Sequence, residues 1–202
     1  MPTAIKILGD RPCLDFVNTT GGWIGAAVIN DKLIRYDDLV RWAELAGVIP
    51  AEQARVLARR SRRHPAEAGQ VLRRAIALRR AVREMFRAVL GQRKPKPADT
   101  AAFERELAIA RSHQRLKHRG GRFEWSWDDR ESALDSMLWA VSSSAADLLT
   151  SPDLSHVRQC GGETCGWMFL DRSRNHSRQW CDMGDCGNRA KVRRYRQRQR
   201  AT

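Results

Sequence analysis

The chain has 202 residues and a formal net charge of +14, because 37 Lys and Arg residues outnumber 23 Asp and Glu residues. An apolar fraction of 42% that includes seven Trp and five Phe is enough to build a core, which excludes a mainly disordered chain. No apolar run approaches the roughly 18 residues of a membrane span, and the N-terminus lacks an apolar segment of signal-peptide length. We therefore expect a cytoplasmic protein with no membrane contact.

The positive charge is concentrated at the C-terminal end. Residues 187–202 hold seven basic side chains and no acidic one, so they supply half of the net charge. Such a block is typical of a segment that binds a polyanion, and the alternative is a solvated, frayed end.

In chain order, the N-terminal half predicts one short strand followed by helices. The run CLDFVN at 13–18 has the composition of a strand, which the glycine pair after it would end. Apolar spacing favours a helix over 36–46 with Gly47 placed to cap it, and Pro50 can open a second helix.

The clearest helix is expected over about 65–90, where apolar residues recur at steps of four and three. Its polar side carries four arginines: Arg73, Arg80, Arg83 and Arg87. Such a row could meet phosphates, although a solvated helix face is the more common explanation.

A hairpin is expected next, with two extended runs on either side of Gly120-Gly121. Aromatic residues alternate with polar ones in its second strand, so we expect one strand face to be aromatic and buried. The alternative is a platform for stacking nucleic-acid bases. A second amphipathic helix should follow the pair Asp128-Asp129 and end near Thr150, where SPDL marks a domain boundary.

Four cysteines follow in the pattern C-x4-C-x15-C-x4-C: Cys160, Cys165, Cys181 and Cys186. Two close cysteine pairs separated by a loop can supply the four soft ligands of a tetrahedral zinc site. The alternatives are two disulfides or free core thiols, and His176 is a weaker candidate ligand. Cys13 lies far upstream on an apolar segment, so we expect a small buried side chain there.

The segment after the last cysteine has a helix-compatible composition and no proline. A metal site would fix the start of this helix, which is how small zinc modules present a helix to nucleic acid. The candidate DNA-binding residues are Arg189, Lys191, Arg193, Arg194, Arg196 and Arg198, together with Arg174 and Arg178 of the loop. Arginine favours bidentate contacts with phosphate or guanine.

The C-terminal third resembles the CGNR zinc finger, through the tetrapeptide Cys186-Gly187-Asn188-Arg189 and the cysteine pattern before it. The segments CLDFVNT, YDDLVRWAELAGVI and AADLLTSPDL are similar to the ABATE domain, which precedes that finger in bacterial proteins. The resemblance implies an α+β fold. A mainly helical domain with short strands and a hairpin would span residues 1–152, and a treble-clef-like finger with a basic C-terminal helix would span 153–202. It also implies one structural zinc on the four cysteines and a stress-related transcription regulator.

The first functional hypothesis is therefore a zinc-dependent DNA-binding regulator of bacterial transcription, which binds double-stranded DNA and is not an enzyme. Its N-terminal domain would sense a small-molecule effector or mediate assembly. Asp15 and Asn18 are polar groups on an apolar segment and could belong to a ligand site, or they could cap backbone groups. The alternatives are a zinc-stabilised module that binds RNA or protein, and an enzyme with a structural zinc, for which the sequence holds no catalytic motif.

Overall fold

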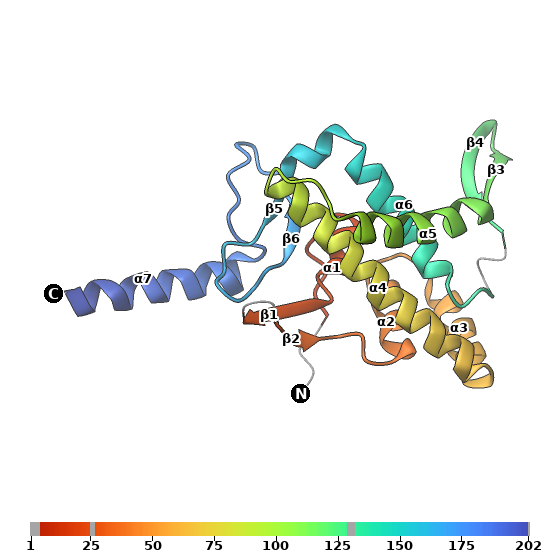
Figure 1. Cartoon of the computed structure of the whole chain (residues 1–202), viewed down its shortest axis with the longest axis horizontal. Coiled ribbons are helices and arrows are strands. Elements are labelled where there is room, and N and C mark those ends of the chain that lie inside the picture. The colour runs from red at the N-terminus through yellow and green to blue at the C-terminus, as the bar shows by residue number, and fades with distance from the viewer. Residues whose placement is uncertain (1–4, 25–26, 129–131, 202) are drawn as a thin grey trace.

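The computed structural model describes residues 5–24, 27–128 and 132–201 (Figure 1). Helices dominate, and the strands form three antiparallel two-stranded sheets, β1–β2, β3–β4 and β5–β6, which confirms the α+β class. The elements are α1 (Pro12–Val17), β1 (Thr20–Ile24), β2 (Ala27–Asp31), α2 (Tyr36–Leu45), α3 (Ala51–Arg63), α4 (Pro65–Leu90), α5 (Pro97–His113), β3 (Gln114–Arg119), β4 (Arg122–Trp127), α6 (Ser136–Leu149), η1 (Pro152–His156), β5 (Val157–Gln159), β6 (Met168–Leu170), η2 (Met183–Gly187) and α7 (Asn188–Ala201). Among the described helices, none combines the length and apolar composition that crossing a bilayer requires.

The helix expected over 65–90 is α4, a long helix that crosses the helical part of the molecule (Figure 1). Its apolar stripe is buried in the core. The helix expected over 36–46 is α2, and Gly47 follows it with φ of 65°, the left-handed conformation that glycine adopts without strain.

The prediction of a strand at 13–18 is wrong, because these residues form most of α1, with Pro12 in its first turn. All of Cys13–Val17 is buried, so no polar face reveals the period of the helix in the sequence. Cys13 itself is a buried free thiol, as expected, and burial raises its pKa to about 12.

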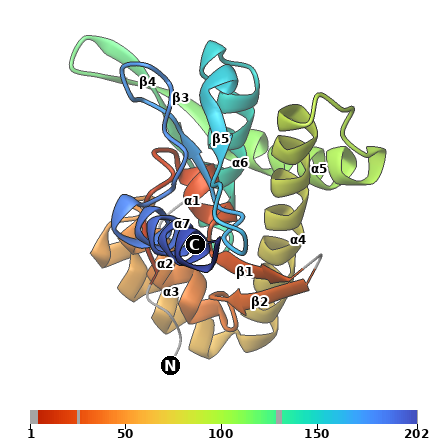
Figure 2. The same cartoon turned by 90° about the vertical axis from the view of Figure 1, so that its left-hand side faces the viewer.

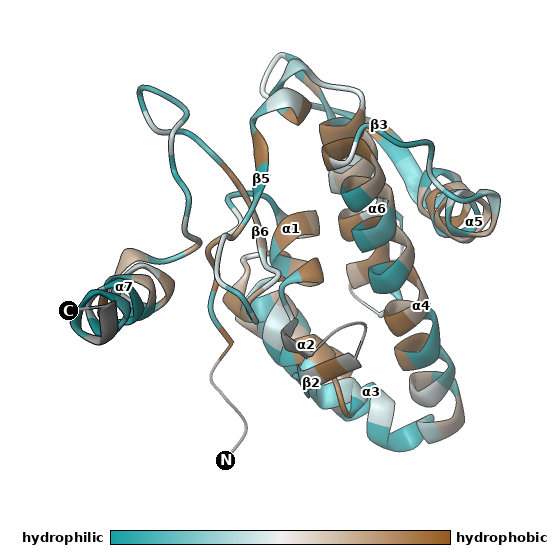
Figure 3. Ribbon diagram, turned by 60° about the vertical axis from the view of Figure 1, so that its left-hand side comes forward, coloured by the Kyte–Doolittle hydropathy of each residue, from teal (hydrophilic) through white to brown (hydrophobic). Residues whose placement is uncertain are grey.

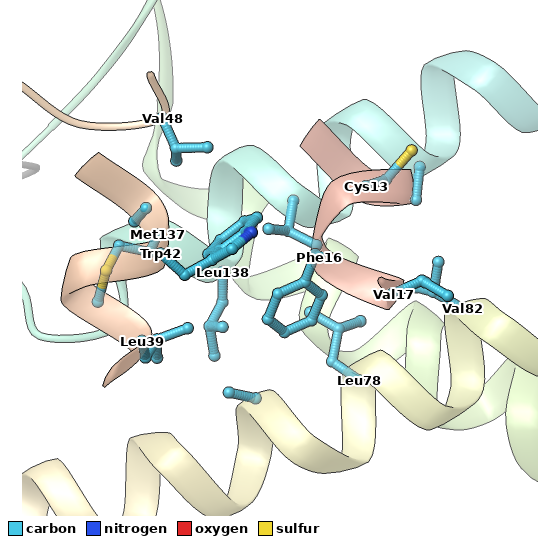
Figure 4. Packing of buried hydrophobic residues seen from close by; sticks show 14 of the residues in the cluster. Cys13, Phe16, Val17, Leu39, Trp42, Val48, Leu78, Val82, Met137 and Leu138 are labelled. Carbon is cyan, nitrogen blue, oxygen red and sulfur yellow. The ribbon is translucent and has the colours of Figure 1, made fainter. Parts of the chain in front are cut away.

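The core is built around α1 (Figure 4). Phe16 of α1 contacts Trp42 of α2, with ring centroids 4.9 Å apart, and Leu78 of α4 and Leu138 of α6 belong to the same buried cluster. Strand β6 divides its side chains by the two-residue period of a strand. Met168 and Leu170 join this core, whereas Phe169 joins a second cluster with three of the clustered cysteines.

The hairpin β3–β4 forms as expected, with Gly120 and Gly121 at positive φ in its turn. Its aromatic face is not buried, however: Phe123 is 69% exposed and Trp125 is 66% exposed. The hairpin extends away from the helices (Figure 1), and Trp127 at its base approaches Trp139 of α6 at 6.0 Å. The prediction of a buried strand face is therefore wrong over most of its length.

The helix predicted after Asp128-Asp129 is α6, which begins at Ser136 with Asp135 at its N-cap position. Asp129 lies outside the described residues. The helix ends at Leu149, followed by Thr150, as the apolar spacing predicts.

Candidate metal centre and nucleic-acid interface

The four clustered cysteines come from two short segments, 160–165 and 181–186, that meet beside β6. Their sulfur atoms all lie within 4.8 Å of one another, with Cys165 Sγ 3.6 Å from Cys181 Sγ and Cys181 Sγ 3.7 Å from Cys186 Sγ. A tetrahedral zinc with Zn–S bonds of about 2.3 Å places its sulfur ligands about 3.8 Å apart. The sulfur positions therefore fit one tetrahedral metal ion, and all the cysteines are free thiols rather than disulfides.

Backbone groups close around these sulfur atoms. The N–H groups of Gly162 and Cys181 donate to Cys160 Sγ at 3.5 Å and 3.4 Å. A Cβ added at Gly162 would lie 3.3 Å from Cys186 Sγ, so the glycine lets the chain turn tightly around the sulfur cluster. Such N–H donors stabilise thiolate charge.

The charge balance of the cluster also calls for a cation. Hydrogen bonds from Cys165 and Cys181 lower the pKa of Cys160, while the same contacts with Cys160 raise the pKa values of Cys165 and Cys181. One thiolate therefore opposes the ionisation of its neighbours, and a divalent metal is what allows all of them to ionise. An all-sulfur tetrahedral donor set selects zinc over hard cations such as Mg²⁺ or Ca²⁺.

Helix α7 begins directly after the last cysteine and extends away from the body of the protein (Figures 1 and 2). Most of its residues are hydrophilic (Figure 3), and Ala190, near the metal site, is buried. The first turn is tied to the cysteine cluster by Arg189, whose Nη2 donates to Cys186 Sγ at 3.2 Å. One turn further on, Arg193 pairs with Glu163 at 2.5 Å.

Residues 10–152 match the model of the ABATE family, described as "Putative stress-induced transcription regulator", and residues 156–199 match the CGNR zinc finger. The chain belongs to the ABATE family. A comparison with curated proteins finds no match. The finger match and the sulfur geometry together assign Cys160, Cys165, Cys181 and Cys186 as the ligands of one structural zinc.

The candidate DNA-binding residues of this ABATE-family protein fall into two groups. On α7, Lys191, Arg194, Arg196 and Arg198 are exposed, whereas Arg189 and Arg193 take part in the contacts described above. In the loop before Cys181, Arg174 is exposed.

Arg178 has a structural role in the same loop. It donates to the carbonyl oxygens of Trp180 and Cys181 at 3.0 Å and 2.6 Å, and its guanidinium lies 4.2 Å from the centre of the Phe169 ring. His176 is not among the clustered ligands; its ring stacks on that of His156, with centroids 4.0 Å apart.

The two polar residues of α1 are used inside the protein. Asp15 Oδ1 accepts from the N–H groups of Leu8 and Gly9 at 2.8 Å and 2.7 Å. Asn18 donates to the carbonyl of Met168 at 2.7 Å and accepts from the N–H of the same residue at 2.8 Å. These contacts favour the backbone-capping alternative over the ligand site expected at Asp15 and Asn18.

Several contacts between the ABATE domain and the finger were not predicted from the sequence. Trp167 Nε1 donates to the carbonyl of Thr20 at 2.8 Å, and Arg83 donates to the carbonyl of Gly166 at 3.0 Å. Lys6 bridges Asp182 and Asp185 at 3.1 Å and 2.8 Å. These partners are 80 or more residues apart in sequence, so no local pattern could have indicated them.

Proposed function

We propose that this protein is a DNA-binding transcription regulator of the bacterial cytoplasm, in which α7 contacts double-stranded DNA. The observation that carries the proposal is a basic helix that projects into solvent from a zinc site fixing its first turn. At 1.5 Å per residue, its 14 residues extend about 21 Å, and the major groove of B-DNA admits a helix of this size.

The arrangement of side chains on α7 supports contact with both walls of a groove. Lys191, Arg194 and Arg198 share one face by the i, i+3, i+7 spacing of a helix. Arg189, Arg193 and Arg196, at steps of four and three, share a nearly opposite face. Cations on two faces can reach the phosphates of both strands while the helix lies between them.

Two exposed apolar side chains, Val192 and Tyr195, lie between these basic residues on α7. Apolar contact with the methyl group of thymine is one of the ways in which a helix reads base edges in the major groove. We therefore assign the phosphate contacts to the basic residues and a contribution to base preference to Val192 and Tyr195.

The zinc has a structural rather than a catalytic role in this proposal, because four cysteine ligands close the coordination sphere to water and substrate. The N-terminal ABATE domain would sense a stress-related effector or mediate assembly. The ABATE domain packs directly on the finger, which supports this role, since a conformational change in one domain would alter the contacts of the other.

The test is a salt series of fluorescence anisotropy on the zinc-loaded full chain with duplex DNA, duplex RNA and heparin. Four to six phosphate contacts predict a slope of log affinity against log salt of about −4 to −5 on duplex DNA. The triple change Arg194→Gln, Arg196→Gln and Arg198→Gln should flatten that slope by roughly two to three units.

The matched control removes the same charge from an exposed face of α3, by Arg55→Gln, Arg59→Gln and Arg62→Gln. If both triple variants flatten the slope equally, net charge rather than α7 is responsible and the proposal fails. Preference for RNA over duplex DNA would instead support the RNA-binding alternative.

A further inference from the structure

A cleft of about 890 Å³ lies where α4, the β1–β2 hairpin and the zinc finger meet. One helical stripe of α4 lines it, composed of Ile76, Arg80, Arg83 and Arg87 at steps of four, three and four. These arginines belong to the row that the sequence marked as either phosphate-binding or solvated. The volume of the cleft is within the range of about 300–1,000 Å³ that is usual for small-molecule sites.

Arg83 is not a solvated member of that row. Only 5% of Arg83 is exposed, and its Nη1 donates a hydrogen bond to the carbonyl of Gly166 at 3.0 Å. Burial lowers the pKa of Arg83 to about 10, and the neighbouring Arg87 acts in the same direction. The side chain is still a cation at neutral pH, so it contributes positive charge to a buried part of the cleft wall.

The carboxylates of the cleft pair with arginines other than Arg80. Asp31 pairs with Arg79 at 2.6 Å and Glu84 with Arg87 at 3.1 Å. Glu163 pairs with Arg193, which lies on α7 outside the lining residues. The lining therefore carries more positive than negative charge.

Apolar side chains complete the lining. Val28 of β2 and Ile76 of α4 are both exposed, and both belong to the cleft. We propose that the cleft binds a small organic anion, whose carboxylate or phosphate group lies against Arg80 and Arg83 and whose apolar part covers Val28 and Ile76. This chemistry combines a few charged anchors with an apolar wall, as ligand sites usually do.

The position of the cleft gives this ligand a route to the DNA-binding helix. Gly162, Glu163 and Gly166 line it from the turn that carries the first two zinc ligands. An anion beside Glu163 adds negative potential at Arg193, which lies outside the cleft, and so holds Arg193 more firmly on the finger and away from a DNA phosphate. Ligand binding should therefore lower DNA affinity, a step that rests on the proposed function.

The site is tested without DNA, by titration calorimetry of the zinc-loaded chain with four probes. Phenyl phosphate and benzoate carry an apolar ring with a phosphate or carboxylate, inorganic phosphate lacks the ring, and benzamide lacks the charge. We expect one saturable site per chain for at least one of the two ring anions, about tenfold weaker binding of inorganic phosphate, and no binding of benzamide. Which ring anion binds more tightly distinguishes a phosphate ligand from a carboxylate ligand.

Arg80→Gln should weaken binding of that ring anion about tenfold, whereas Arg73→Gln, an exposed arginine of the same helix outside the cleft, should leave it within about twofold. The proposal is overturned if neither ring anion saturates, if inorganic phosphate binds as tightly as the ring anions, or if both variants have the same effect.

The regulatory step is tested separately, by DNA anisotropy at matched ionic strength with and without saturating ring anion. Wild-type protein should bind DNA more weakly with the anion, and Glu163→Gln, which removes the ion-pair partner of Arg193 in both states, should reduce this response. An unchanged DNA affinity in wild type refutes the regulatory step. If the protein does not bind DNA at all, the proposed function fails, and calorimetry still decides whether the anion site exists.

Discussion

Replacing Asn18 with alanine is expected to destabilise the whole chain by about 2–6 kcal/mol. The Asn18 amide is buried and forms hydrogen bonds with both the carbonyl and the N–H of Met168. Alanine removes both partners at once and leaves two backbone groups of β6 buried and unsatisfied. Each such group costs about 1–3 kcal/mol, and their sum gives the expected loss.

The assay is urea unfolding of the zinc-loaded protein followed by circular dichroism. The control is Asn175→Ala in the exposed loop of the finger, which should change the free energy of unfolding by less than about 0.5 kcal/mol. Asn18→Asp keeps an acceptor for the Met168 N–H but places an oxygen against its carbonyl, so it should be at least as destabilising as alanine. A loss below about 0.5 kcal/mol for Asn18→Ala would refute the view that this side chain holds β6 to α1.

Two further predictions concern the finger. When zinc is removed with a chelator, the ABATE domain and the finger should still unfold in a single transition, but at a lower melting temperature. The reason is that β6 contributes side chains to both buried clusters. Two separated transitions in calorimetry would contradict this. Arg178→Gln should weaken zinc binding about 10–100-fold, because Arg178 holds the carbonyl groups of Trp180 and of the ligand Cys181. The measurement is a competition assay with a chromogenic chelator, and the control Arg174→Gln in the same loop should leave zinc affinity unchanged. Equal zinc affinities of the two variants would remove the structural role of Arg178.

The parts of the fold that the sequence predicts are those in which local periodicity is complete. Helix α4 repeats its apolar residues from Val71 to Leu90 with one polar side, and Pro65 marks its start, so local signals predict the whole helix. The zinc site is equally local, because four cysteines within 27 residues define both the donor set and the loop between the pairs.

The errors occur where the surroundings of a segment decide its structure. Helix α1 packs against α4, α6 and β6, so its residues are buried on every side and their sequence resembles a strand. The strand β4 shows the opposite case. Its alternating aromatics fit a buried face, but no other described element covers that face, so Phe123 and Trp125 are exposed.

The row of arginines on α4 shows how tertiary contacts give different roles to residues of one sequence pattern. Arg73, Arg80 and Arg87 are exposed, whereas Arg83 is buried because the turn around Gly166 lies over it. That turn is fixed by the zinc ligands Cys160 and Cys165, which follow Arg83 by 77 and 82 residues. The burial of Arg83 therefore depends on the finger being folded. The cleft in which we place the anion depends on the folded finger as well. The zinc site therefore links the cleft to α7, since the metal positions both a wall of the cleft and the helix that would contact DNA.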